Sequence, residues 1–262
     1  MSCLTERVTQ AVILAAGRGS RMGAATASRP KCLTPIAGKT LLEWTLAGLS
    51  ANGIRNVLVV TGWQHHQLAP FPVETQLNTR WSETNMVRSL LSAEAHLSHQ
   101  STLILYGDGA YSSRSVQSAL RGPNRDIVVP VDLQWESLWR RRFIDPLVDA
   151  ETLAFSADRI TAIGQRPERI EQIQGQFMGM LRSTPRGWQR ILRWLQNFEN
   201  QHGPHSVDRL DMTGLLARML NDGEPIYWTG VHGGWVEIDS SADLAAAETG
   251  LDDPRFLHDF RT

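Results

Sequence analysis

The chain has 262 residues, of which 42% are hydrophobic and 20% are charged, a composition typical of a globular protein with a sizeable core. Its 26 lysine and arginine residues balance 27 acidic residues, and the net charge of −1 excludes a nucleic-acid-binding protein that relies on a broad basic face. The two cysteines, Cys3 and Cys32, show no CxxC spacing, which argues against a disulfide framework and indicates a reducing compartment.

The first ten residues, MSCLTERVTQ, contain a glutamate and no apolar stretch, so they do not have the pattern of a secretory signal. No apolar run elsewhere approaches the ~20 residues that a membrane span needs. We therefore expect a cytoplasmic protein with neither a membrane nor a nucleic acid as its partner. A homodimer is left open.

Four short apolar runs rich in valine, isoleucine and leucine predict buried strands at 11–16, 56–62, 102–108 and 126–132. Between them, residues 40–53 begin with Thr40 and place Glu43 three positions later, which is the capping-box pattern of a helix. Residues 85–97 also have helical spacing, with Met86, Leu90, Ala93 and Leu97 on one face. Strands that alternate with helices indicate an α/β protein with a parallel or mixed sheet.

The pattern changes after about residue 145. Residues 153–164 predict two short strands around a turn at Asp158, and residues 175–183 predict one more strand. Amphipathic helices are expected at 186–200 and 208–223, followed by strands and a final helix within 226–248 that is capped by Ser240 with Asp243. We expect one domain over 1–262, with a nucleotide-binding half of about 1–145 and an acceptor-binding part of about 146–262.

A glycine-rich segment, GRGSRMG at 17–23, follows the first predicted strand. Such a turn exposes backbone N–H groups to phosphate oxygens, and the arginines can neutralise the anion. A tight strand-to-helix turn explains the same glycines equally well. The spacing excludes a P-loop, and Met22 stands where a dinucleotide fingerprint needs glycine.

The continuation LAAGRGSRMGAATASRPKCLTPIAGKTLLEW, residues 14–44, resembles the signature of the sugar-phosphate nucleotidylyltransferase superfamily. The resemblance implies a three-layer α/β/α, nucleotide-diphospho-sugar-transferase-like (Rossmann-like) fold, with a mixed, mostly parallel sheet and a C-terminal elaboration. It implies that Arg21 and Lys31 offset the charge of the reacting phosphates as catalytic residues. It also implies that the nucleotide lies along Ala15, Ala16, Gly17, Gly19, Ser20 and Arg21.

Later segments resemble one branch of that superfamily, the bacterial phosphocholine and phosphonoalkyl-amine cytidylyltransferases. They are residues 81–93, 103–112, 128–153, 172–181, 210–220 and 233–248. The branch implies transfer of CMP from CTP to 2-aminoethylphosphonate or phosphocholine, with release of pyrophosphate. Two alternatives stay open: a sugar-1-phosphate nucleotidylyltransferase, and a non-catalytic nucleotide-sensing domain on the same fold.

Phosphoryl transfer between anions usually needs Mg²⁺ held by carboxylates. Asp108 ends a predicted strand, at the sheet edge where α/β proteins bind ligands. The resemblance implies that Asp108 and Asp239 are the metal ligands and that Asp108 is catalytic. Taken alone, Asp108 is explained as a strand-end cap and Asp239 as a charge at a helix N-terminus.

The resemblance also implies binding positions for the two substrates. The nucleobase and ribose are expected near Gln64, Asn85, Ser89 and Gly107, although Asn85 also suits a helix N-terminus. A cationic acceptor suits aromatic faces and carboxylates, and its expected contacts are Trp135, Asp132, Asp149, Glu151, Asp211 and Glu237.

Three further features bear on the acceptor site. Met212 stands where an aromatic residue helps to enclose a trimethylammonium, which favours a smaller amine. The arginines at 140–142 are interpreted as a solvated face or as neighbours of the acceptor anion. The core is the expected place for Trp139, Trp188 and Trp194.

Overall fold

The computed structural model describes residues 7–262, so Cys3 and most of the segment that does not read as a signal lie outside the described part. Cys32 is a buried free thiol, and burial raises its pKa to about 12. Among residues 7–262, no helix has both the length and the apolar character to cross a membrane.

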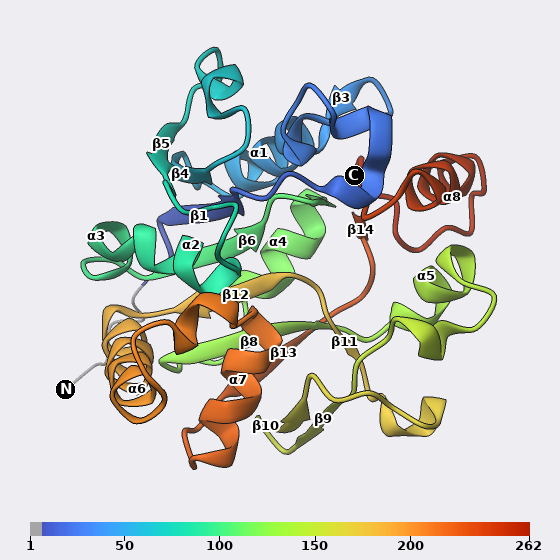
Figure 1. Cartoon of the computed structure of the whole chain (residues 1–262). Helices are drawn as coiled ribbons and strands as arrows, with labels where there is room; N and C mark the ends of the chain where they lie inside the picture. Colours follow the sequence, from blue (N-terminus) through green and yellow to red (C-terminus); the bar gives the residue numbers. More distant parts are fainter. Residues whose placement is uncertain (1–6) are drawn as a thin grey trace.

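A ten-stranded mixed sheet forms the centre of the molecule (Figure 1). Its order is β5–β4–β1–β6–β12–β8–β13–β10–β9, and β11 pairs with β8. Strands from both halves of the chain lie in this one sheet. Their bounds are β1 Gln10–Ala15, β4 Asn56–Thr61, β5 Glu74–Leu77, β6 Thr102–Tyr106, β8 Ile127–Asp132, β9 Leu153–Ser156, β10 Arg159–Ile163, β11 Gln176–Phe177, β12 Met180–Ser183 and β13 Tyr227–Val231.

The four predicted apolar strands are confirmed as β1, β4, β6 and β8. β1 is flanked by β4 and β6 in parallel, β5 pairs in parallel with β4, and β13 pairs in parallel with β8. The loops after β1 and β6 therefore emerge together at the carboxyl edge of the sheet, where α/β proteins bind ligands. The predicted pair at 153–164 is confirmed as β9 and β10, which are antiparallel.

The single strand predicted at 175–183 is wrong, because the segment is divided between β11 and β12. Gly179 between them has φ +68°, a conformation that ends an extended strand. β12 then runs antiparallel between β6 and β8. β12 therefore joins the two parallel portions of a sheet that is also antiparallel at β9 and β10.

Helices cover both faces of the sheet, which confirms the predicted three-layer fold. Alternate residues of β1 point into two different cores, with Ala11 and Ile13 on one face and Val12 and Leu14 on the other. The first core also holds side chains of α1 Leu41–Ala51, α4 Ser113–Leu120, α5 Trp135–Arg142 and α8 Ser241–Leu251. The second holds side chains of α2 Met86–Ser92, α3 Glu94–Leu97, α6 Pro185–His202 and α7 Met212–Asn221.

Two capping predictions are confirmed and two helix boundaries are not. Thr40 with Glu43 caps α1, and Ser240 with Asp243 caps α8, each through a complete capping box. The helix predicted over 85–97 is interrupted at Ala93, whose φ and ψ of −94° and 11° depart from helical values. The helix predicted over 208–223 begins only after Asp211, because a short 3-10 turn, Ser206–Arg209, precedes it.

Small pairs of strands complete the carboxyl edge: β2 Pro35–Ile36 with β3 Lys39–Thr40, and β7 Gly109–Tyr111 with β14 Trp235–Glu237. The second pair joins residues that are more than 120 positions apart in the chain. Figure 1 shows the consequence: the red helix α8 lies beside the blue segment that follows β1, and the two are in contact.

Asp208 connects the loop before α2 to the turn before α7. Its carboxylate accepts hydrogen bonds from Arg80 Nη2 and Arg88 Nε, both at 2.6 Å, and lies 3.0 Å from His205 Nδ1. Burial opposes ionisation, but these donors outweigh it and hold the pKa of the Asp208 carboxyl at about 2, below its ordinary value of 3.8.

We expect Asp208→Asn to lower the free energy of unfolding at pH 7 by about 1–2 kcal/mol, a value reduced by the solvent exposure of Arg80. Because the pKa of Asp208 is lower in the folded state, its contribution is present above about pH 4 and is lost as the pH falls toward 2. Urea unfolding from pH 7 to pH 2 measures this. The difference from wild type should shrink across that window, whereas the exposed control Asp252→Asn should show no such change.

Candidate functional site

The loop after β1 leads directly into a pocket at the carboxyl edge. Gly19 has φ +67°, and a Cβ at this residue would lie 2.8 Å from Cδ of Lys31. Glycine is therefore required for the lysine stem to cross the loop. A Cβ at Gly17 would meet no atom within 4 Å, so the backbone there borders open space. The loop is held from within by Thr26, whose hydroxyl donates to the carbonyl of Gly19 at 2.8 Å.

The side chain of Lys31 lies between two carboxylates from distant segments. Its Nζ donates to Asp108 Oδ2 at 3.0 Å and to Asp239 Oδ1 at 2.5 Å. Only 12–15% of each of these three side chains is exposed. Arg21 Nη2 lies 3.0 Å from the same oxygen of Asp239, but its side chain is largely exposed. The predicted catalytic cations and metal ligands are thus in direct contact.

The pairing of β14 with β7 brings these carboxylates together. Asp108 occupies the turn between β6 and β7, and Glu237 stands opposite Gly109 in the antiparallel register. The amide of Ile238 donates to the carbonyl of Asp108 at 3.0 Å. Glu237 and Asp239 are consequently fixed beside Asp108.

Electrostatics at this cluster follow from its burial. Burial alone would lower the pKa of the Lys31 ammonium, but Asp108 and Asp239 outweigh that effect and raise it. Burial likewise opposes ionisation of Asp239, yet Lys31 and Arg21 hold the pKa of that carboxyl below its ordinary value. Glu237 has fewer compensating contacts, and burial raises its pKa to about 7.

Asp108, Glu237 and Asp239 form a group that can hold a metal ion. One oxygen from each carboxylate lies within 4.8 Å of the other two. In addition, Asp108 Oδ1 is buried and has no hydrogen-bond partner, which is costly for a carboxylate oxygen unless a cation meets it. All the donors are hard oxygens, so the set suits Mg²⁺.

The first pocket lies between the glycine loop, the turn after β6 and the start of α2. Seven of the residues predicted for the nucleotide line it, together with Lys31 and Asp108: Ala15, Ala16, Gly17, Gly19, Asn85, Ser89 and Gly107. Its wall also includes Leu14, Cys32, Trp81, Thr84 and Met86, which the sequence analysis did not identify. Three predicted residues, Ser20, Arg21 and Gln64, are not among the lining residues. Asn85 also caps α2, as the alternative interpretation proposed.

The second pocket adjoins the first and shares Met86 and Asp108 with it. It is rich in carboxylates and contains three aromatic side chains, Tyr106, Trp139 and Phe177. The predicted acceptor residues Asp149, Glu151, Asp211 and Glu237 line it, as do Arg21, Asp239, Gln176 and Thr213. One continuous surface therefore runs from the glycine loop past Asp108 to a cluster of acids.

Two residues predicted for the acceptor do not reach this pocket. Asp132 is completely buried and accepts hydrogen bonds from Trp235 Nε1 at 2.9 Å and from two backbone amides, and it also contacts His258 at 2.7 Å. Its oxygens are satisfied within the protein. Trp135 is 4% exposed and packs in the core against Trp139. Both predictions are wrong because these side chains support the site from beneath.

The indole that borders the second pocket is Trp139, which the sequence analysis assigned to the core alone. It is only 3% exposed, yet it borders the pocket, and its Nε1 donates to Asp149 at 3.1 Å. Trp188 and Trp194 are core residues, as expected. Helical spacing could have indicated that Trp139 lies beside Arg142, because Trp135, Trp139 and Arg142 lie on one face of α5.

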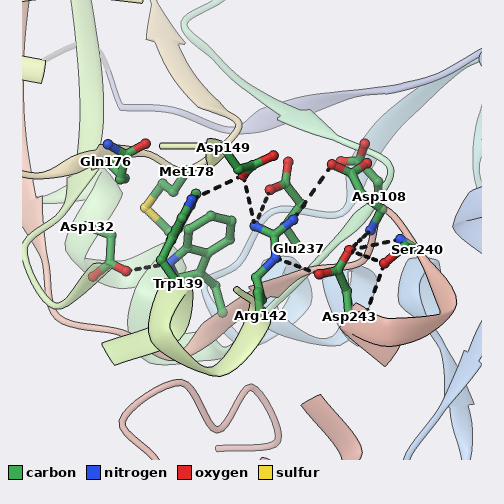
Figure 2. A network of polar contacts seen from close by, with 12 residues as sticks. Asp108, Asp132, Trp139, Arg142, Asp149, Gln176, Met178, Glu237, Ser240 and Asp243 are labelled. Carbon is green, nitrogen blue, oxygen red and sulfur yellow. Dashed lines mark hydrogen bonds and ion pairs between the residues drawn. The ribbon is translucent and has the colours of Figure 1, made fainter. Parts of the chain in front are cut away.

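Arg142 is the organising cation beneath the acids, and Figure 2 shows it surrounded by them. Its side chain is 2% exposed and donates to Glu237 Oε2 at 2.8 Å and to Asp243 Oδ1 at 2.9 Å. Asp149 and Asp239 lie at 3.9 and 3.7 Å from its guanidinium nitrogens. For Arg142, the prediction of a solvated face is wrong, because this residue alone of the three arginines turns inward.

Comparison with known proteins agrees with this geometry. The chain is 26% identical over 246 residues to the CTP:phosphoglutamine cytidylyltransferase of Campylobacter jejuni, covering 89% of this chain and 97% of that one. It is 32% identical over 127 residues to the CMP-5'-(3-aminopropyl)phosphonate synthase of Streptomyces rubellomurinus, covering 45% of this chain and 20% of that one.

Two solved structures share the fold at 18% identity. They are the inositol-1-phosphate CTP transferase of T. maritima, with a TM-score of 0.73 and coverage of 92% and 93%, and the CTP:phosphocholine cytidylyltransferase of Streptococcus pneumoniae, with a TM-score of 0.72 and coverage of 94% and 99%. Residues 11–175 match the MobA-like NTP transferase domain, so the resemblance drawn from the sequence is confirmed and the chain belongs to the MobA-like NTP transferase family.

Proposed function

We propose that this protein transfers CMP from CTP to a small phosphate or phosphonate that carries an ammonium group, with release of pyrophosphate. The observation that carries the proposal is the meeting of two pockets at Asp108, one bordered by the glycine loop and the other by carboxylates. The names of the similar proteins support CTP as the donor and a small phosphorylated or phosphonylated molecule as the acceptor.

In this reaction an acceptor oxygen attacks the α-phosphorus of CTP. A new oxygen–phosphorus bond forms, and the bond from that phosphorus to the bridging oxygen of the β-phosphate breaks, so that pyrophosphate leaves with the electron pair. The acceptor is already an anion and needs no general base. Lys31 offsets the charge of the two anions at the reacting phosphate, and Arg21 offers a second cation at the mouth of the site.

We infer that Mg²⁺ is held by Asp108 and Asp239, the ligands expected from the sequence, with Glu237 as a third. When bound, it would neutralise phosphate charge and polarise the phosphoryl oxygens. The chain's own contribution is to hold these carboxylates in place, through the β7–β14 pair and through the contact of Arg142 with Glu237.

The acids of the second pocket favour a primary ammonium over a trimethylammonium. Burial raises the pKa of Asp149 and of Glu151, and neighbouring acids raise both further, so a cation entering the pocket relieves an unfavourable concentration of negative charge. A primary ammonium donates three hydrogen bonds to such oxygens, and a trimethylammonium donates none. Tyr106, Trp139 and Phe177 offer the aromatic faces that either cation can use. We therefore rank 2-aminoethylphosphonate above phosphocholine.

The geometry of the two pockets supports the sugar-1-phosphate enzyme and the nucleotide sensor less well than the proposed reaction. A sugar-1-phosphate offers no positive charge to the cluster of acids. A nucleotide sensor would have no use for an acid-lined pocket that adjoins the nucleotide pocket at Asp108. Both remain outcomes of the experiments below.

We expect pyrophosphate release with CTP in preference to UTP, dTTP, GTP and ATP, and with ammonium-bearing acceptors in preference to glucose 1-phosphate. The acceptor panel comprises 2-aminoethylphosphonate, phosphocholine, phosphoglutamine, inositol 1-phosphate and glucose 1-phosphate. Turnover with glucose 1-phosphate alone would indicate the sugar enzyme. Nucleotide binding without turnover of any pair would indicate the sensor.

Lys31→Ala and Asp108→Ala should each lower kcat at least about a hundredfold, because each removes a charged group from the reacting phosphates. Asp108→Ala should also raise the Mg²⁺ concentration required for half-maximal activity, because it removes a proposed metal ligand. Steady-state rates over a Mg²⁺ titration measure both quantities, and circular dichroism verifies the fold. Two folded variants with wild-type rates would contradict the assigned roles.

Glu151→Gln and Asp211→Asn should raise KM for 2-aminoethylphosphonate by about three- to tenfold and leave KM for CTP unchanged, because each removes one charge from the acceptor pocket. Asparagine retains the cap that Asp211 gives to the amide of Gly214, so α7 should persist. Asp222→Asn, at the other end of α7, is the matched control. Equal KM values in the variants and the control would exclude this pocket as the ammonium site.

A further inference from the structure

A separate polar cavity, distinct from the first and second pockets, lies at the opposite edge of the sheet from the candidate site. It has a volume of about 550 Å³ and is bordered by the residues that precede β1, β6 and β8 and by the residue that follows the antiparallel strand β12. Its lining comprises Arg7, Val8, Asn52, Ser101, Gln117, Leu120, Arg121, Gly122, Asn124, Arg125, Arg182 and Thr184. The proposed reaction uses none of these residues.

The charged side chains that line this cavity within the described residues are all positive. Four arginines line it, and no aspartate or glutamate is among the described lining residues. Arg125 forms an ion pair with Asp158 at 3.3 Å, in which both side chains are about half exposed, and its guanidinium also lies over the ring of Tyr227. Such an exposed pair contributes little stability, and within residues 7–262 no carboxylate forms an ion pair with the other three arginines. In a chain of net charge −1, this local excess of positive charge is not an average property of the surface.

Arg182 is the buried member of the four, with 7% of its surface exposed. Its guanidinium donates to the backbone carbonyls of Leu120 at 2.9 Å and Gly122 at 3.3 Å, and to that of Pro123. These bonds cap the end of α4 and fix the direction of the side chain. They supply no counter-charge.

Arg142, another buried arginine of this protein, has different partners. Arg142 is surrounded by four carboxylates, whereas the hydrogen-bond partners of Arg182 within residues 7–262 are all backbone carbonyl oxygens. A buried cation without a carboxylate is costly unless an anion meets it. The cavity beside Arg182 has room for one, and Arg121 and Arg125 line the same cavity.

We propose that this cavity is a binding site for a small phosphate-bearing anion, separate from both substrate pockets. Guanidinium groups bind phosphate oxygens in a bidentate manner, and four of them suit an oligophosphate better than a single carboxylate. Asn52, Gln117, Asn124 and Thr184 add neutral hydrogen-bonding groups for the remainder of such a ligand. The site is on the opposite sheet edge from the glycine loop, so its ligand does not displace the nucleotide.

Isothermal titration calorimetry with tripolyphosphate in EDTA tests this site. The protein carries Arg21→Ala and Lys31→Ala, so that two cations of the candidate active site are absent and the result does not depend on the proposed reaction. We expect one tripolyphosphate per chain in this background. Adding Arg121→Gln and Arg125→Gln should weaken its binding at least about tenfold.

The matched control adds Arg55→Gln and Arg193→Gln, two exposed arginines that do not line the cavity, and should bind as the background protein does. Thermal melting verifies the fold. If Arg121→Gln with Arg125→Gln unfolds the protein, Arg7→Gln provides a second variant of the cavity. Absence of binding in the background protein, or equal affinity in the cavity variant and the control, would overturn the proposal.

Discussion

The ammonium of Lys31 between Asp108 and Asp239 is the interaction on which the rest of the site depends. It joins the loop after β1, the turn after β6 and the segment after β14, three parts of the chain that share no local sequence. Removing one partner would leave a partly buried charge without its complement, which is strongly destabilising. In the proposed nucleotidyl transfer the same charges would meet phosphate oxygens, so stability and chemistry would be coupled here.

The surrounding acids carry negative charge that the fold compensates only in part and that a bound cation would neutralise. Arg142 lies beneath them and compensates part of their charge, yet burial still raises the pKa of Asp149, Glu151 and Glu237. The fold thus keeps more carboxylate at this edge than its own cations neutralise. A metal ion and an ammonium group would each lower that cost, and in the proposed function this would favour an ammonium-bearing acceptor without a large apolar cage.

The sequence was informative where local physics determines the structure. Apolar runs predicted the central strands, and capping boxes located the starts of α1 and α8, because both depend on neighbouring residues alone. The carboxyl-edge rule for α/β sheets pointed to Asp108, whereas Asp239 came from family resemblance, since its position depends on the pairing of β14 with β7. No local pattern encodes that pairing.

The predictions that were wrong depended on the direction in which a side chain points rather than on its residue type. Asp132 and Trp135 have suitable chemistry but point into the protein, whereas Trp139 and Arg142 on the same helix reach the acids. The helical phase of α5 groups Arg142 with Trp135 and Trp139, which argues against a solvated face for Arg142, but it does not separate Trp135 from Trp139.

The near-zero net charge conceals a separation of charge across the sheet. Carboxylates gather at the carboxyl edge around the second pocket, and arginines gather at the amino edge around Arg182. Net charge excludes a broad basic face, because that would require a global excess of one sign, but it places no limit on two opposed local fields. A molecule organised in this way can attract a cationic acceptor at one edge and an anion at the other. The placement of charge along the sheet therefore says more about ligands than its sum over the chain.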